Sequence, residues 1–212
     1  KKIYIKRKDM KNIKFIALFL AIFIALSGCS NDESNATQTS QSNLYKAGDE
    51  IELTSIIGSK ATIIRTENGF KLKDSDKILM LDIFGTYCAP CQKEAPHLMD
   101  FQLKNADKFM IIGLIHFEDV SDEYVLENFS KKYNAYYFIS NSKENSKIID
   151  QALNDISYNR ALSIPFKVVL KDGKYQNLSD NLGGTTTQNK FYLGEVSTNT
   201  ISQDIDKILD AN

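Results

Sequence analysis

The chain has 212 residues, with 26 Lys and Arg side chains against 27 Asp and Glu, and 42% of its residues are hydrophobic. Residues 1–28 hold seven of the basic side chains and a single acidic one, so the remainder carries a net charge of about −7. No basic excess is left to attract nucleic acid, and no nucleic-acid partner is expected. The roughly 165 residues from position 48 onward are enough for one domain with a sizeable core.

The first 28 residues have the pattern of a targeting segment. A basic stretch precedes an apolar run of 14 residues, Phe15 to Gly28, which is shorter than the roughly 20 residues that span a bilayer as a helix. The run closes with Leu26-Ser27-Gly28-Cys29, which resembles a bacterial lipobox. This resemblance implies cleavage before Cys29 and lipid on its thiol. The alternative is an uncleaved signal anchor with an incidental cysteine.

Residues 30–43 are polar, without aromatic or branched aliphatic side chains, and cannot bury a core. We therefore divide the chain into three parts. Residues 1–28 are predicted to be a lipoprotein signal peptide, and residues 29–47 a lipidated cysteine with a flexible polar tether. Residues 48–212 are predicted to be the folded domain.

The domain alternates strand and helix patterns. Strands are predicted at 50–57, 61–66, 70–73, 78–84, 109–115, 135–139 and 166–170, with a tight turn at 172–173 leading to a partner strand at 174–178. Helices are predicted after Cys88, around 120–129, after a cap at Ser142, and from a capping box at 200–203. Strands alternating with helices predict a mixed sheet covered on both faces.

The sequence Cys88-Ala89-Pro90-Cys91 follows the buried strand 78–84 through a short turn. That position places Cys88 at a helix N-terminus, where free N–H groups and the helix dipole stabilise a thiolate. Cys91 follows on the same helical face, close enough to form a disulfide with Cys88, and Pro90 suits a first helical turn. The pattern predicts a two-electron redox switch.

The segment 88–98, CAPCQKEAPHL, is similar to the TlpA/ResA branch of the thioredoxin superfamily. Asp82 precedes Cys88 by six residues and Pro96 follows Cys91 by five, as in the family. Residues 163–166, SIPF, resemble its cis-proline loop. The resemblance implies an α/β thioredoxin-like fold, with a central mixed sheet flanked by helices on both faces. It also implies an N-terminal β-strand extension and a β-α insertion between the CxxC helix and the cis-proline loop.

Disulfide exchange needs an attacking thiolate and a second thiol that resolves the mixed disulfide. We assign attack to Cys88, at the exposed, open start of the helix, and resolution to Cys91, one turn deeper. A carboxylate within an apolar strand should have a raised pKa, so Asp82 could take the proton of Cys91. The alternative is that Asp82 reaches water at the end of the sheet. Thioredoxins usually place a lysine near this acid on the neighbouring strand, and residues 109–115 contain none.

The remaining assignments concern the rim of the site. A cis bond before Pro165 would expose the backbone of Ile164 to an extended substrate, and Tyr87 would form an apolar rim. Glu94 could tune the thiols, or it could be solvated on the helix surface. The residues assigned to substrate contact are Tyr87, Ala89, Pro90, Ile164 and Pro165.

Three rival sites are disfavoured. A zinc site needs four ligands, and only His97 and His116 could join the cysteines. On an ideal helix His97 lies about 180° from Cys88, which also argues against a Cys–His hydrolase. Haem attachment needs His where Gln92 stands. No metal or organic cofactor is expected, only the redox-active pair.

Together these features predict a thiol–disulfide oxidoreductase on the periplasmic, extracytoplasmic side of a bacterial membrane, held in the bilayer by lipid on Cys29. The resemblance implies reduction of cysteine pairs in exported proteins, apocytochrome c among them. It also implies electrons from a membrane thiol donor of the CcdA or DsbD type. Thiol oxidase or disulfide isomerase activity is an alternative. Another is a lipoprotein of this fold that only binds or chaperones partners.

Overall fold

A computed structural model describes residues 44–182 and 188–211. The predicted signal peptide, Cys29 and most of the predicted tether lie outside these residues. All of these described residues belong to one compact unit. Its ordered contacts begin before position 48: the Tyr45 N–H donates to Gln151 Oε1 at 2.9 Å, and the Tyr45 ring packs edge-on against Phe70. Within the described ranges, no helix is both long enough and apolar enough to cross a membrane.

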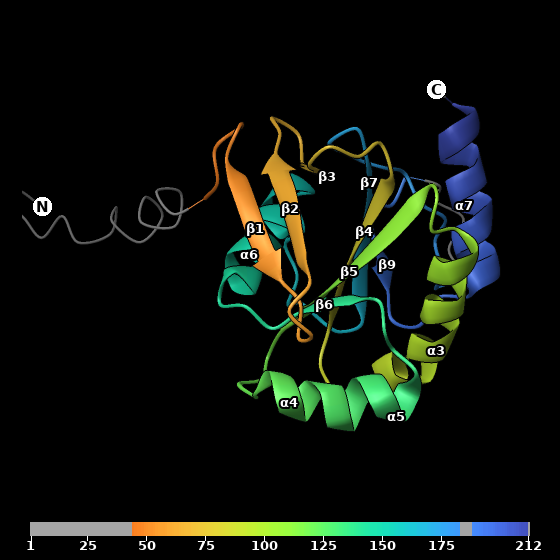
Figure 1. The fold of residues 1–212 in the computed structure, drawn as a ribbon. Helices are drawn as coiled ribbons and strands as arrows, with labels where there is room; N and C mark the ends of the chain where they lie inside the picture. Colours follow the sequence, from red (N-terminus) through yellow and green to blue (C-terminus); the bar gives the residue numbers. More distant parts are fainter. Residues whose placement is uncertain (1–43, 183–187, 212) are drawn as a thin grey trace, which may run out of the picture. The chain divides into compact units, whose positions relative to one another are not determined.

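A six-stranded mixed sheet forms the centre of the domain (Figure 1). Its strands are β4 (Ile78–Phe84), β5 (Phe109–Ile115), β6 (Phe138–Ser140), β7 (Phe166–Lys171), β8 (Lys174–Tyr175) and β9 (Tyr192–Leu193). The order is β6-β5-β4-β7-β8, and β9 also pairs with β7. Strands β4, β5 and β6 are parallel, whereas β7 runs antiparallel to β4. The predicted mixed sheet is confirmed.

A second, antiparallel sheet of three strands precedes the centre: β1 (Glu50–Thr54), β2 (Lys60–Arg65) and β3 (Phe70–Leu72). The helices are α3 (Ala89–Lys104), α4 (Asp122–Val125), the π-helical turn η2 (Leu126–Ser130), α5 (Lys131–Tyr133), α6 (Glu144–Asp155) and α7 (Thr198–Asp210). Helices α3 and α7 lie together on one side of the domain in Figure 1, and α6 and β1 lie on the other.

Strand alternation divides the interior into two cores. On β4, Ile78, Met80 and Phe84 join the core beneath α3 and α7, whereas Leu79, Leu81 and Ile83 join the core beneath α6 and the three-stranded sheet. Side chains alternate along a strand, so Asp82 lies on the same face of β4 as Met80 and Phe84. The fold therefore turns the side chain of Asp82 toward α3, the helix that carries the cysteines.

Several boundaries differ from the prediction. Helix α7 begins at Thr198 because Ser197, not Thr200, is the N-cap, and the Ser197 Oγ accepts the Thr200 N–H at 3.1 Å. Strands β1, β6 and β8 are shorter than expected, and β9 was not predicted. The predicted turn at Asp172-Gly173 is confirmed, with φ values of 51° and 77°, as hairpin turns of the primed type require.

Candidate active site

The strand–turn–helix unit β4–α3 positions the cysteines. Cys88 is the N-cap of α3, Pro90 lies in the first turn, and the Cys91 N–H donates to Cys88 Sγ at 3.3 Å. The sulfur of Cys88 thus occupies the capping position that an oxygen usually fills. A negative charge on that sulfur would meet a helix N–H and the positive end of the helix dipole.

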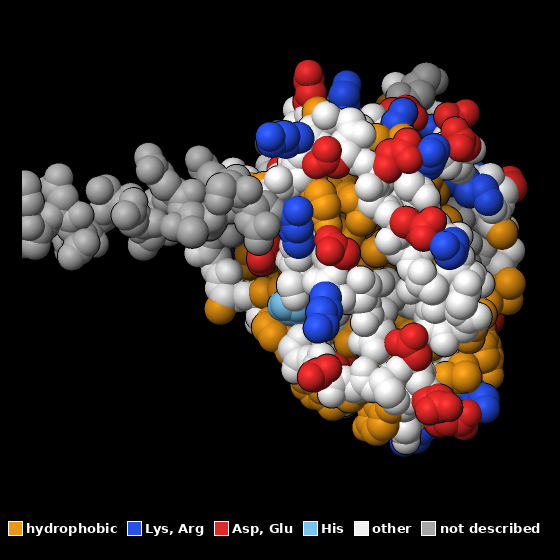
Figure 2. Space-filling model, turned by 60° about the vertical axis from the view of Figure 1, so that its left-hand side comes forward, with side chains coloured by type: hydrophobic (Ala, Val, Ile, Leu, Met, Phe, Trp, Pro, Cys, Tyr) orange, Lys and Arg blue, Asp and Glu red, His pale blue; other side chains and the backbone are white. Residues whose placement is uncertain are grey.

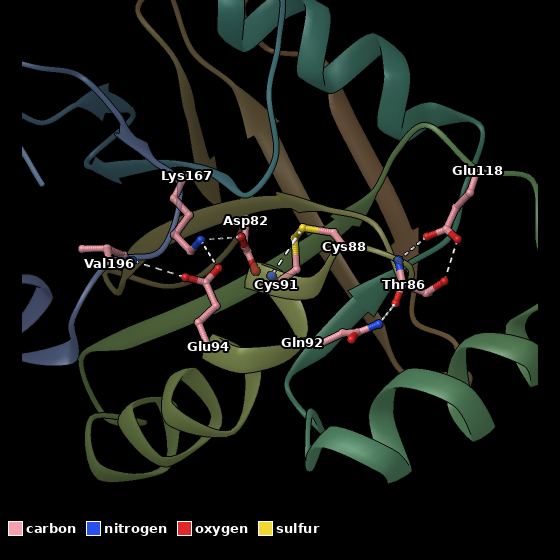
Figure 3. The surroundings of a disulfide bond; sticks show 9 residues. All are labelled: Asp82, Thr86, Cys88, Cys91, Gln92, Glu94, Glu118, Lys167 and Val196. Carbon is pink, nitrogen blue, oxygen red and sulfur yellow. Dashed lines mark hydrogen bonds and ion pairs between the residues drawn. A yellow bond between two sulfur atoms is a disulfide. The ribbon is translucent and has the colours of Figure 1, made fainter. Parts of the chain in front are cut away.

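Cys88 and Cys91 form a disulfide, with their Cα atoms 5.2 Å apart (Figure 3). Cys88 is 7% exposed and Cys91 is 2% exposed. Cys88 is therefore the outer sulfur, as expected, but it is less exposed than the prediction of an open helix start implied. Its side chain joins the core beneath α3, against which Ile164 also packs.

The loop before Cys88 is held by a carboxylate that the sequence did not identify. The Thr86 N–H and hydroxyl both donate to the carboxylate of Glu118, and Gln92 Nε2 donates to the Thr86 carbonyl at 2.7 Å. Figure 3 shows this group beside the disulfide, on the side away from Lys167. These bonds fix the approach of the chain to the N-terminus of α3.

The predicted cis peptide bond between Ile164 and Pro165 is confirmed. Since Phe166 pairs with Ile83, Pro165 lies at the sheet edge where β4 ends. A side chain at Gly85 would come within 3.1 Å of Ile164 Cδ1 and 2.9 Å of the Tyr87 ring. The proline loop and the cysteine loop are therefore neighbours.

The residues assigned to substrate contact differ in exposure. Tyr87 is 60% exposed, and Ala89 and Pro90 are exposed at the start of α3. Ile164 is half-buried and Pro165 is buried. An exposed rim thus follows the chain from Tyr87 to Pro90 around the outer sulfur.

Asp82 is 1% exposed, so the alternative in which it reaches water is wrong. In the sheet register it lies opposite Lys167 of β7 on one side and Gly113 of β5 on the other. Lys167 Nζ is 3.2 Å from Asp82 Oδ1. The lysine that thioredoxins usually place near this acid is absent from β5, the neighbour of β4 on one side. Here β7, the neighbour on the other side, supplies Lys167 on the same face of the sheet as Asp82.

Glu94 is 2% exposed, and the alternative of a solvated surface residue is wrong as well. Its carboxylate accepts a hydrogen bond from Lys167 Nζ and also faces the Val196 N–H at 3.4 Å. One ammonium group therefore contacts two carboxyl groups, one from β4 and one from α3. Figure 3 shows the three side chains converging beside the disulfide.

Comparison with known proteins tests the predicted architecture. No protein-family model matches the chain. Among solved structures, this chain is similar to a thiol:disulfide interchange protein of the thioredoxin family from Chlorobium tepidum, with a TM-score of 0.51 and 16% sequence identity. The alignment covers 76% of this chain and 94% of the Chlorobium chain. StoA from Bacillus subtilis aligns with a TM-score of 0.47 and 14% sequence identity. That alignment covers 74% of this chain and 96% of the StoA chain. At these identities the likeness concerns the fold.

The chain has the thioredoxin fold. The predicted fold class is confirmed, with the three-stranded sheet as the N-terminal extension. Strand β6 and helix α6 form the insertion between α3 and the proline loop.

The acid cluster of this thioredoxin fold has unusual titration properties. Burial raises the pKa of Asp82, against the attraction of Lys167, and raises the pKa of Glu94 to about 7. Burial alone would lower the pKa of Lys167, but the charges of Asp82 and Glu94 raise it above the usual lysine value. Because both carboxyl groups contact the same ammonium group, the ionisation of one affects that of the other.

Two further residues shape the cluster and were not identified from the sequence. Tyr137 is 7% exposed, and burial followed by the charges of Asp82 and Glu94 raises its pKa. A side chain at Gly113, opposite Asp82, would lie 3.1 Å from Tyr137 Cε2. Gly113 therefore leaves room for the tyrosine ring. A glycine inside a buried strand was the available sequence signal.

The two histidines lie outside this cluster. His97 is exposed on α3, and His116 is half-buried just after β5. Among residues 44–182 and 188–211, no three His, Cys, Asp or Glu side chains are arranged to hold a metal ion.

Proposed function

We propose that this protein is a thiol–disulfide oxidoreductase that works through the Cys88/Cys91 couple. The observation that carries the proposal is the position of Cys88. Its sulfur is bonded to Cys91 and accepts the Cys91 N–H in the first turn of α3. Cys88 is also the more exposed residue of the pair. A helix terminus stabilises the thiolate that exchange requires.

The reaction in the reducing direction has three balanced steps. The Cys88 thiolate attacks a substrate disulfide, forms a mixed disulfide and releases one substrate thiolate. Asp82 then takes the proton of the Cys91 thiol. The Cys91 thiolate attacks Cys88 Sγ, which restores the Cys88–Cys91 disulfide and releases the second substrate thiolate. The protein has lost two electrons, and the substrate has gained them.

The substrate in this proposal is an extended protein segment that contains a cysteine pair. The exposed rim formed by Tyr87, Ala89 and Pro90 surrounds the outer sulfur. The half-buried Ile164 lies beside it on the proline loop. These groups offer apolar contact and backbone, which suit a polypeptide without a fixed sequence.

We further propose that the protein works outside the cytoplasm, tethered through lipid on Cys29. Its clients would be exported proteins, apocytochrome c among them, and a dithiol carrier in the membrane would return it to the reduced state. On the face drawn in Figure 2, toward β1 and α6, acidic and basic side chains are interspersed, so this face offers no basic patch to nucleic acid.

The test is a trap for the mixed disulfide. In Cys91→Ala the attacking thiol remains and the resolving thiol is gone, so client proteins should stay covalently bound to Cys88 in an extracytoplasmic compartment. Cys88→Ala is the matched control and should capture none. Thiol-reversible adducts on Cys91→Ala alone would support the proposal. Adducts on neither variant, with partners still recovered non-covalently, would instead favour a protein that only binds its clients.

A further inference from the structure

Phe117, in the loop after β5, has an unusual backbone conformation. Its φ is 65°, in the left-handed region that a bulky residue rarely adopts. The other described non-glycine residues with positive φ have short polar side chains, which can bond to the nearby backbone: Asp74, Asn134, Ser157 and Asp172. A phenylalanine ring offers no such bond, so its place in this conformation needs another explanation.

Burial within the domain does not supply that explanation. Phe117 is 55% exposed. Its ring lies beside that of the half-buried His116, with the ring centroids 4.1 Å apart. Single exposed apolar side chains are common on protein surfaces, but backbone strain of this kind is concentrated at functional sites. The combination of strain and exposure indicates that the ring contacts something outside the domain.

The loop that carries Phe117 is bound to the cysteine loop (residues 85–88) on both sides of this residue. Before it, the His116 N–H donates to the Phe84 carbonyl at 3.0 Å. After it, the carboxylate of Glu118 accepts the Thr86 hydroxyl at 2.6 Å and also the Thr86 N–H. Figure 3 shows Glu118 and Thr86 beside the disulfide. Phe117 is therefore held next to the proposed active site.

The sheet topology places Phe117 across the cysteine loop from Ile164. Strand β4, which leads into the cysteine loop, lies between β5 and β7. Phe117 follows β5, which is parallel to β4, and Ile164 precedes β7, which is antiparallel, so both lie at the same edge of the sheet. Tyr87, in the cysteine loop itself, is 60% exposed. Apolar side chains thus flank the cysteine loop from both neighbouring strands.

We propose that Phe117 determines substrate specificity: its exposed ring contacts an apolar, preferably aromatic, side chain next to a cysteine of the client's disulfide. This inference rests on the proposed function and deepens it, because it names the kind of cysteine pair that the protein selects. Aromatic pairs add a directional contact to the apolar area that they bury, and aromatic residues often dominate the energy of protein interfaces. Phe117 takes no part in the sulfur exchange itself.

The experiment compares two synthetic peptides, each closed by one disulfide. In one peptide Phe stands on both sides of each cysteine, and in the other Ser does. The reduced full chain carrying Cys29→Ser is mixed with each peptide, and the rate constant of peptide reduction is measured. Bis(2-hydroxyethyl) disulfide is the third substrate, because it has no side chain for Phe117 to contact.

The variants separate the ring of Phe117 from its backbone conformation. Phe117→Gly and Phe117→Asn remove the ring, and both replacements tolerate a positive φ. If one of the two does not fold, the other decides. Phe117→Tyr keeps an aromatic ring. Leu103→Ala is the matched control, because Leu103 is 62% exposed but lies in the last turn of α3, at the opposite end from Cys88.

We expect Phe117→Gly and Phe117→Asn to reduce the Phe peptide about fivefold more slowly than the wild type, the effect of losing one aromatic pair. Their rates with the Ser peptide and the small disulfide should be unchanged. Phe117→Tyr and Leu103→Ala should match the wild type with all three substrates.

Two results would overturn the inference. One is an unchanged rate with the Phe peptide when the ring is removed. The other is an equal loss with all three substrates, which would mean that Phe117 only shapes the cysteine loop. A wild type that reduces none of the three substrates would count against the proposed function instead.

Discussion

At the scale of single residues, Glu94 links the acid cluster to the stability of the domain. Burial raises its pKa from 4.5 to about 7, so the folded protein binds this proton more tightly than the unfolded chain does. The free energy of unfolding should therefore fall as pH rises between these two values. The expected loss is up to about 3 kcal/mol.

Glu94→Gln removes this titration. We expect its free energy of unfolding, measured with urea at pH values from about 5 to about 7, to fall with pH less steeply than that of the wild type. Glu67→Gln, at an exposed position of the β2–β3 turn, should retain the wild-type slope. Equal slopes for wild type and Glu94→Gln would show that Glu94 does not hold a proton in the folded protein.

The same residues show what the sequence could and could not predict at this scale. The burial of Asp82 followed from its place in an apolar strand. Lys167 could not be assigned as its partner, because that depends on β7 pairing with β4 in one register. Glu118 gave no signal either, since it lies 32 residues from the Thr86 that it binds.

At the scale of elements, a buried ion pair connects the three-stranded sheet to α6. Arg65 of β2 donates from both terminal nitrogens to Asp155 at the end of α6, and both side chains are less than 10% exposed. The Tyr175 hydroxyl and Gln151 Nε2 donate to the same carboxylate. Side chains from β2, α6 and β8 thus donate to the single carboxylate of Asp155.

Arg65→Met should therefore destabilise the domain strongly, because it leaves Asp155 buried with neutral donors only. Removing one partner of a buried pair typically costs about 3–5 kcal/mol. Lys60→Met, which breaks the exposed pair with Glu52, should cost less than about 1 kcal/mol. Urea unfolding of both variants measures the difference. Similar losses in the two would contradict a fastening role for Arg65.

Element length decided which elements could be predicted. Strands β4 and β5 are continuous apolar runs, and α3 begins at a proline-containing turn, so their patterns are distinct. Strand β8 contains only two residues, but the Asp172-Gly173 turn predicted it as a hairpin partner of β7. Strand β9 also contains two residues, too few for a periodic pattern, and its pairing with β7 is not encoded in the local sequence.

At the scale of the whole molecule, the proposed tether gives a direct prediction. If lipid on Cys29 anchors the protein, Cys29→Ser should move it from the membrane fraction to the soluble fraction of the bacterial cell. Several acyl chains hold a protein stably, whereas an unmodified chain lacks that anchor. Cys91→Ala, which leaves Cys29 intact, is the control. Retention of Cys29→Ser in the membrane would favour the uncleaved signal anchor.

The proposed function requires Cys88 and Cys91 to form a reversible couple in the folded protein, which a redox titration against glutathione measures. In the full chain carrying Cys29→Ser, we expect a single two-electron transition. Its midpoint should be nearer the roughly −270 mV of a reductant than the roughly −120 mV of a strong oxidant. A midpoint near the latter would reverse the proposed direction. If the pair exchanges with glutathione only after the protein unfolds, the proposed function is wrong.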